Sequence, residues 1–200
     1  MTSSTPAGLR ERKKAKTRAA IREHALRLFD EQGYASTTVE QIADAAEVSP
    51  STFFRYFPTK EDVVLTDDYD EPIMAAMLAQ PADLHPAAAM RRAIRQVFSA
   101  ITPADWAIEQ RRQRLVYQVP ELQARAMQQY ATMIGLVGSV IAERAGLPSD
   151  DFSARVMAGA VIGAALAAYP QGTRGHPDFS DVGRMDEALK LLEAGLPLGP

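Results

Sequence analysis

The chain has 200 residues, of which 46% are hydrophobic and 24% charged, and its formal net charge at pH 7 is −3. These values are typical of a globular protein with a substantial core, in one domain or in two joined domains. The sequence contains no cysteine, which excludes a disulfide framework and thiolate chemistry and fits a reducing cytoplasm.

The N-terminal part of the chain is predicted to form a basic helix from about Arg10 to Gly33. Its apolar face is made by residues at helical spacing, namely Ile21, Ala25, Leu28 and Phe29. Residues 10–27 include eight basic and two acidic side chains, and residues 1–60 carry a net charge of +3 against −6 for the remainder. A basic tip on an acidic body suits docking of one end on DNA. A solvated charged helix start is the alternative, and the motif that follows favours the DNA interpretation.

Two short helices come next, separated by a tight turn, and the second carries a cluster of aromatic and basic residues. We expect Thr37 to cap the first helix, with Glu40 closing a capping box. Ser49 is expected to cap the second helix, with Pro50 at its first position, and Pro58 to end it. A helix this short is unstable in isolation and must be held against a scaffold, as in a helix-turn-helix.

Residues 15–64 resemble the DNA-binding domain of the tetracycline-repressor (TetR) family of bacterial transcriptional regulators. The matching stretches are LFDEQGY at 28–34, TTVEQIADAA at 37–46 and VSPSTFFRYFPTKEDV at 48–63. Spacing and residue type agree across three helices and both turns. The resemblance implies a small N-terminal DNA reader followed by a larger helical ligand domain.

Two positions depart from the family's pattern. Glu47 stands where the family usually has glycine, and a left-handed glutamate there would cost on the order of 1 kcal/mol. Phe54 stands where the family often has a tyrosine whose hydroxyl bonds phosphate. Phe54 is therefore expected to pack against a sugar or to serve the core.

Prolines, glycines and capping residues delimit the remaining predicted helices. Thr59 caps a fourth helix, which Pro72 should kink or split. Later helices are expected over 87–100, 103–118, 120–146, 149–169 (capped by Ser149) and 181–194, with a loop rich in glycine and proline at 170–177.

The longest apolar stretch, 156–169, is too short to span a membrane, and no secretory signal is visible, so a cytoplasmic protein with no membrane partner is expected. The expected fold class is all-α, with about nine helices. A helix-turn-helix domain at 1–62, with a basic arm at 1–14, precedes a ligand-binding and dimerisation bundle at 63–200.

The candidate DNA contacts are side chains that can donate hydrogen bonds from the reader: Thr37, Thr38, Ser49, Ser51, Thr52, Arg55, Tyr56 and Lys60. Hydroxyls and helix N-termini suit phosphate oxygens, whereas Arg55 can make a bidentate contact to guanine or bind phosphate. By resemblance, Thr52, Tyr56 and Lys60 match the family's backbone contacts, and Pro50, Ser51 and Arg55 its groove-facing positions. Thr37 and Ser49 would be caps with or without DNA, and Phe53 and Phe57 should be core.

A hydrophobic ligand pocket is predicted where large adaptable side chains should converge: Met74, Met77, Phe98, Trp106, Tyr117, Met127, Tyr130 and Met133. For any one of these residues, plain core packing is the alternative. Arg111, Arg112 and Arg114 could meet an anionic head group. The favoured effector is therefore a hydrophobic small molecule, with lipid-like acyl compounds as the first class to test.

The small residues in AGAVIGAALAAY, at 158–169, predict a close helix–helix contact through Gly159, Gly163 and Ala167. This contact could be the centre of a monomer or an isologous dimer interface. The resemblance implies a homodimer formed by the last two long helices.

No constellation for catalysis or metal binding is recognised, and no cofactor is expected. His24, His85 and His176 are scattered, and the sequence lacks a nucleophile elbow, a dinucleotide fingerprint and a P-loop. The acidic residues at 67–71 could hold a cation or an amine, although a solvated helix face is the stronger interpretation.

The sequence therefore indicates a transcriptional regulator, a repressor that binds an inverted-repeat operator in double-stranded DNA as a homodimer and is released by its effector. The alternative is a helical small-molecule-binding or enzymatic protein that has lost DNA binding.

Overall fold

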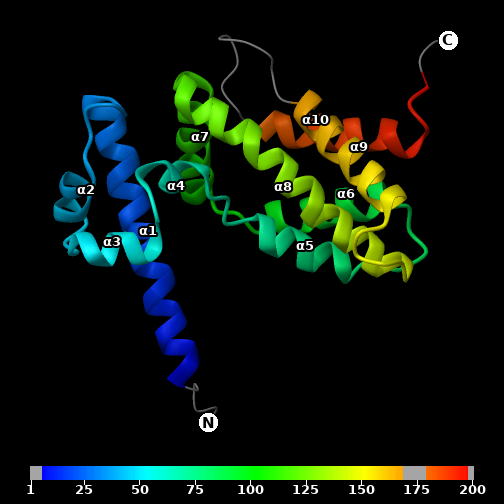
Figure 1. The fold of residues 1–200 in the computed structure, drawn as a ribbon, viewed down its shortest axis with the longest axis horizontal. Coiled ribbons are helices and arrows are strands. Elements are labelled where there is room, and N and C mark those ends of the chain that lie inside the picture. Colours follow the sequence, from blue (N-terminus) through cyan, green and yellow to red (C-terminus); the bar gives the residue numbers. More distant parts are fainter. Residues whose placement is uncertain (1–5, 169–178, 198–200) are drawn as a thin grey trace. The chain divides into compact units, whose positions relative to one another are not determined.

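The computed structural model of the chain describes residues 6–168 and 179–197. These residues form ten α-helices and no strand, which confirms the all-α class (Figure 1). The chain divides into two compact units, Met1–Thr66 and Asp67–Pro200. Within the described ranges, no helix is both long and apolar enough to cross a membrane.

The first unit contains four helices: α1 (Pro6–Gln32), α2 (Val39–Ala45), α3 (Pro50–Tyr56) and α4 (Lys60–Leu65). Helix α1 contacts α2 and α4, and α2 contacts α3 (Figure 1). The core of this unit contains fully buried side chains from all four helices and from the C-cap of α3: Ile21, Leu26, Ile42, Phe53, Phe57, Val63 and Val64. The apolar side chains of α4 are buried against the other three helices of this unit. The unit therefore extends to Thr66, four residues beyond the predicted boundary at residue 62.

Local side-chain chemistry sets the starts of the short helices. Thr38, and not Thr37 as predicted, caps α2, and Gln41 completes its capping box. The Thr37 side chain is buried and its hydroxyl donates to the carbonyl oxygen of Gly33 at 2.8 Å. The predicted cap at Ser49 is confirmed, and Glu47 adopts the left-handed conformation with φ of 54°.

The second unit contains six helices: α5 (Asp70–Leu78), α6 (Pro86–Phe98), α7 (Pro103–Gln118), α8 (Pro120–Ala145), α9 (Phe152–Ala168) and α10 (Phe179–Glu193). Helix α9 packs between α8 and α10, while α6 contacts α5 and α10 (Figure 1). A Cβ on Gly138 would lie 3.3 Å from Cγ of Arg155, so this glycine allows the close approach of α9 to α8.

Three predicted boundaries in this unit change. The predicted fourth helix is split into α4 and α5, as expected from Pro72, but the interruption at 66–69 precedes this proline, which lies in the first turn of α5. Asp151 replaces Ser149 as the residue that holds the start of α9, because its carboxylate accepts from the amide of Ala154 at 2.9 Å. The predicted loop at 170–177 lies outside the described residues.

Candidate nucleic-acid interface

Helix α3 is held by its buried aromatic side chains and presents its opposite side to solvent. Phe53 and Phe57 have no exposed surface. Pro50, Ser51 and Arg55 are exposed, as expected for groove-facing positions. Phe54 is 50% exposed and contacts the Phe53 ring edge-on, so it lies at the surface and not in the core.

Hydroxyl groups form hydrogen bonds within the first turn of α3. The Ser49 hydroxyl oxygen accepts from the amide of Thr52 at 3.2 Å, and the hydroxyls of Ser49 and Ser51 are 2.9 Å apart. These groups lie at the positively polarised start of the helix, where phosphate oxygens bind well.

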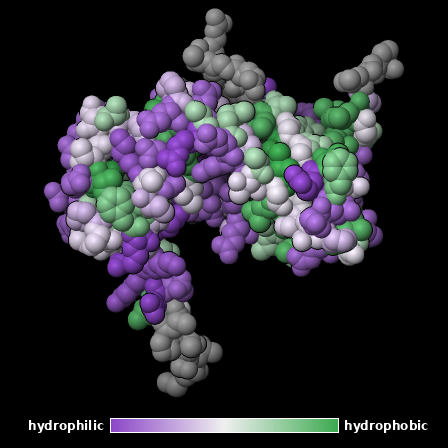
Figure 2. Space-filling view, viewed as in Figure 1, coloured by the Kyte–Doolittle hydropathy of each residue, from purple (hydrophilic) through white to green (hydrophobic). Residues whose placement is uncertain are grey.

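A basic surface depression of about 760 Å³ lies between the N-terminal half of α1 and the C-terminal half of α3. Its lining is mostly cationic or hydroxylic: Arg10, Glu11, Lys13, Lys14, Thr17, Arg55 and Tyr56. Figure 2 shows this part of α1 as largely hydrophilic. The depression therefore joins α3 to part of the basic segment of α1 that the sequence predicts to dock on DNA.

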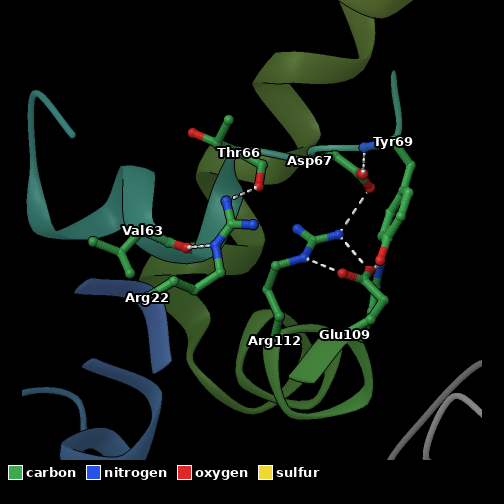
Figure 3. Close-up of polar contacts among 8 residues, drawn as sticks. Arg22, Val63, Thr66, Asp67, Tyr69, Glu109 and Arg112 are labelled. Atoms are coloured by element: carbon green, nitrogen blue, oxygen red, sulfur yellow. Dashed lines mark hydrogen bonds and ion pairs between the residues drawn. The ribbon is translucent and has the colours of Figure 1, made fainter. Parts of the chain in front are cut away.

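Two arginines of α1 bond to the main chain around α3 and α4 and do not line this depression. Arg18 donates to the carbonyl oxygen of Tyr56 at 3.1 Å, and its guanidinium carbon lies 4.5 Å from the centre of the Phe57 ring. Arg22 donates to the carbonyl oxygens of Val63 at 3.2 Å and Thr66 at 2.9 Å (Figure 3). These bonds fix the C-terminal ends of α3 and α4 relative to α1.

Lys60 has a structural role that its position in the sequence does not reveal. Its Nζ donates to the carbonyl oxygens of Tyr34 at 2.9 Å and Thr37 at 3.1 Å, and it lies 4.2 Å from the centre of the Tyr34 ring. An ammonium has three donors, so one remains for a phosphate. Lys60 therefore stabilises the turn between α1 and α2, whatever it contributes to DNA binding.

The predicted pocket residues occupy different environments in the described part of the second unit. Met74 and Met77 are core residues, Met133 packs against the same core, and Phe98 contacts Trp106 with 5.7 Å between ring centres. Tyr130 is partly buried, whereas Tyr117 and Met127 are 40% and 62% exposed.

A groove of about 610 Å³ lies along α5 and the C-terminal half of α6. Small α5 residues form one wall, namely Pro72, Ala75, Ala76 and Ala79. None of the eight predicted pocket residues lines it. The pocket formed by those eight residues stays a prediction.

A buried arginine organises the start of the second unit. Arg112 is 4% exposed, and its guanidinium donates to Glu109 at 2.8 Å and to Asp67 at 2.9 Å (Figure 3). The other Asp67 oxygen accepts from the Tyr69 amide at 2.8 Å. Burial, followed by the nearby Asp67 carboxylate, raises the pKa of Asp70 to about 7. Two carboxylates thus compensate Arg112, which leaves it poorly suited to the anionic head group considered from sequence.

The three predicted dimer residues lie on an unoccupied side of α9. A Cβ on Gly159 or Gly163 would meet no heavy atom within 4 Å in the described protomer. Ala167 is exposed on the same helix, and two larger apolar side chains extend the stripe, Phe152 at 77% and Val156 at 55% exposure. The alternative, that this helix forms the hydrophobic centre of a monomer, applies to its other side, where Ala158 and Val161 lie in the core. The dimer contact at the two glycines stays a prediction.

Comparison with known proteins gives two family matches. The model of the tetR family of bacterial regulatory proteins matches residues 21–66, and that of the MftR C-terminal domain matches residues 84–197. The HTH-type transcriptional regulator TcmR of Streptomyces glaucescens is 42% identical, with 75% of this chain and 70% of TcmR aligned. The chain belongs to the TetR family.

One further relative and one solved structure are similar to this chain. MftR of Mycobacterium tuberculosis, named as a proposed mycofactocin biosynthesis transcriptional regulator, is 27% identical over 92% of this chain and 87% of its own. The fold is similar to that of a proposed TetR-family regulator from Mesorhizobium loti, with a TM-score of 0.50 and 18% identity over 90% of this chain and 96% of that chain. The TetR-family chain is thus a DNA-binding transcriptional regulator, and the relatives it matches are regulators and not enzymes.

Proposed function

We propose that this TetR-family regulator is a cytoplasmic homodimeric repressor that binds an inverted-repeat operator and leaves it when a hydrophobic small molecule binds. The observation that carries the proposal is the α3 surface, where Pro50, Ser51 and Arg55 are exposed beside the cationic depression. Arg55 is the side chain suited to a base edge. The lysines of α1 are suited to phosphates on either side of the major groove, which makes binding dependent on salt.

The apolar stripe on α9 supports the homodimer. Glycines with open space around them allow a second copy of the helix to approach closely, and Phe152 and Val156 supply apolar area. A two-fold dimer presents two readers to two half-sites, separated by about one helical turn of DNA (34–36 Å) or a multiple of it.

Effector release requires that the effector prefer the conformation with low DNA affinity, and binding of DNA then weakens effector binding by the same factor. The two units are joined directly at Thr66 and Asp67, and this short connection supports such coupling. Thr66, the last residue of the reader, is held by Arg22 of its own unit. Asp67, the first residue of the second unit, is held by Arg112 of its own unit.

Mapping of the DNA bound by the protein across its host genome tests the proposal. We expect a small number of sites that share an inverted repeat, and retarded migration of such a fragment on a gel with the purified protein. Uniform weak binding to all DNA, or no binding, would favour the alternative of a helical binding protein that has lost its DNA function.

A further inference from the structure

Helix α3 carries one large apolar side chain that the fold does not bury. Phe53 and Phe57 hold the helix in the core of its unit with no exposed surface, whereas Phe54 is 50% exposed. The exposed half of this ring contributes nothing to folding, because only apolar area removed from water stabilises the fold. A phenyl ring also has no hydrogen-bonding group, so Phe54 cannot bond a phosphate oxygen as a tyrosine would.

Helical spacing places Phe54 on the side of α3 that is assigned to DNA. Pro50 and Ser51 precede it by four and three residues, and residues at these spacings are neighbours on a helix surface. Both are exposed, as is Arg55, which follows Ser51 by four residues and lines the basic depression. The Phe54 ring therefore lies at the edge of a surface whose charge attracts the DNA backbone.

The orientation of the Phe54 ring is supported from below. Its centre lies 5.5 Å from that of the Phe53 ring, and the two planes are at 88°, which is an edge-to-face contact of the favourable kind. Phe53 is fully buried and forms a fixed base for this contact. A side chain that is already oriented loses little freedom when it meets a partner, so less of the interaction energy is lost to ordering.

The major groove of DNA offers one apolar group that suits such a ring. Each base edge displays hydrogen-bond donors or acceptors there, and thymine adds its C5 methyl group, which phenylalanine is among the side chains to contact. Cytosine lacks this methyl group, so the contact distinguishes the two pyrimidines. A sugar also offers carbon atoms, but it is the same at every nucleotide and carries no sequence information.

We propose that Phe54 contacts the C5 methyl group of a thymine in each operator half-site and is a specificity-determining residue of α3. Phe54 then reads an apolar group, and Arg55 beside it reads a polar base edge. This assignment rests on the proposed function, because the thymine belongs to the operator that α3 binds.

The test replaces thymine by uracil, which removes the methyl group and leaves every hydrogen-bonding group of the base in place. Full-length protein is titrated against the operator found by genome mapping, with one thymine position at a time replaced in both half-sites. We expect one position at which the replacement weakens wild-type binding about tenfold, from two methyl groups that each contribute about threefold to fourfold. Unchanged affinity at every thymine position would overturn the proposal.

Two variants identify the side chain that contacts the methyl group. Phe54→Ala should bind the thymine and uracil operators equally, because the variant has already lost the contact that uracil removes. Pro50→Ala is the matched control, an exposed apolar residue on the same side of α3, and it should keep the tenfold ratio between the two operators. A ratio that persists in Phe54→Ala, or that only Pro50→Ala abolishes, would overturn the assignment to Phe54.

Folding of the Phe54→Ala variant is checked by its melting temperature. If the alanine variant does not fold, Phe54→Gln keeps the length of the side chain and its contact with Phe53 while replacing the apolar tip, and the same equal binding of the two operators is expected. A ratio that persists in Phe54→Gln would overturn the assignment in the same way.

Scrambled DNA separates the methyl contact from its alternatives. If Phe54→Ala weakens binding to the operator, to its uracil form and to scrambled DNA by the same factor, the ring packs against the sugar and the proposal is wrong. Sequence-specific binding by wild type without a methyl effect would contradict this proposal alone. A wild type that binds no DNA, or all DNA alike, would contradict the proposed function itself.

Discussion

At the scale of single residues, some cations of the DNA-binding unit bond to its main chain, and others are exposed where they can contact DNA. Arg18, Arg22 and Lys60 are cations of the first kind, because each donates to main-chain carbonyl oxygens. Arg55 and Lys14 are of the second kind, since both are exposed and line the basic depression. A count of positive charge in the sequence cannot separate these roles, because they depend on which carbonyls the fold brings near.

Lys60→Met should destabilise the protein as well as weaken DNA binding. The substitution keeps the aliphatic stem but removes the donor from the carbonyls of Tyr34 and Thr37, which we expect to cost about 1–3 kcal/mol. Chemical denaturation measures this loss. Lys16→Met, at an exposed position of α1, is the control and should change stability by less than about 0.5 kcal/mol. Equal stability of the two variants would show that the Lys60 bonds contribute little.

Asp70 should make stability fall as the pH rises. Its folded-state pKa of about 7 lies above the ordinary 3.8, so the folded protein holds this proton more tightly than the unfolded chain does. The resulting penalty on folding is absent below about pH 4, grows between the two pKa values and is complete above about pH 7. Asp70→Asn removes it, so its gain in melting temperature over wild type should be larger at pH 8 than at pH 5. A gain that is independent of pH, or is matched by Asp83→Asn at an exposed aspartate, would contradict this reasoning.

At the scale of elements, the sequence predicted what depends on neighbouring residues and failed where distant residues decide. The predicted caps at Ser49 and Thr59 are confirmed, and each side chain accepts from an amide three residues on. The predicted cap at Thr37 is wrong, because the Thr37 hydroxyl donates to the carbonyl oxygen of Gly33 in the preceding turn. Thr38 caps α2.

The predicted pocket of methionines and aromatics stays a prediction, because the directions of these side chains depend on how α5 to α8 pack. The groove was not predicted, because its walls are alanines that carry no distinctive sequence signal. The acidic stretch at 67–71 was interpreted from the sequence as a place for a cation or an amine. The fold brings Arg112 and Asp105 near this stretch, and the sequence does not predict either neighbour.

Arg112→Met tests how strongly the start of the second unit depends on its buried cation. Removal of the guanidinium leaves Glu109 and Asp67 without their partner, and we expect a loss of about 3 kcal/mol. Arg95→Met is the matched control, because Arg95 pairs with Asp186 at 2.7 Å but is 55% exposed, which should cost less than about 1 kcal/mol. Similar losses in the two variants would remove the special role assigned to Arg112.

At the scale of the whole molecule, the proposed function requires two copies of the chain, and the α9 stripe is the surface that we propose for their contact. Because Gly163 has open space around it in the protomer, a larger residue there should leave the monomer fold intact. Gly163→Leu should therefore disrupt the dimer by overpacking, which typically costs about 1–3 kcal/mol.

Light scattering with size-exclusion chromatography checks this prediction. Wild type should be a dimer at micromolar concentration, and Gly163→Leu should shift toward monomer while keeping its helical circular dichroism. Gly135→Leu, at an exposed glycine of α8 with equally open surroundings, should remain dimeric. A monomeric wild type, or a fully dimeric Gly163→Leu, would show that α9 is not the interface.

The central claim is that α3 reads a specific DNA sequence, and a fluorescence-anisotropy titration of operator against scrambled DNA tests it most directly. Wild type should prefer the operator strongly, and Arg55→Ala should lose about 1–3 kcal/mol of binding to the operator but little to scrambled DNA. Lys14→Ala should weaken both alike and reduce the salt slope by about one. Equal binding of wild type to both DNAs, or an Arg55→Ala variant that folds and binds like wild type, would contradict the assignment of α3 as the reading element.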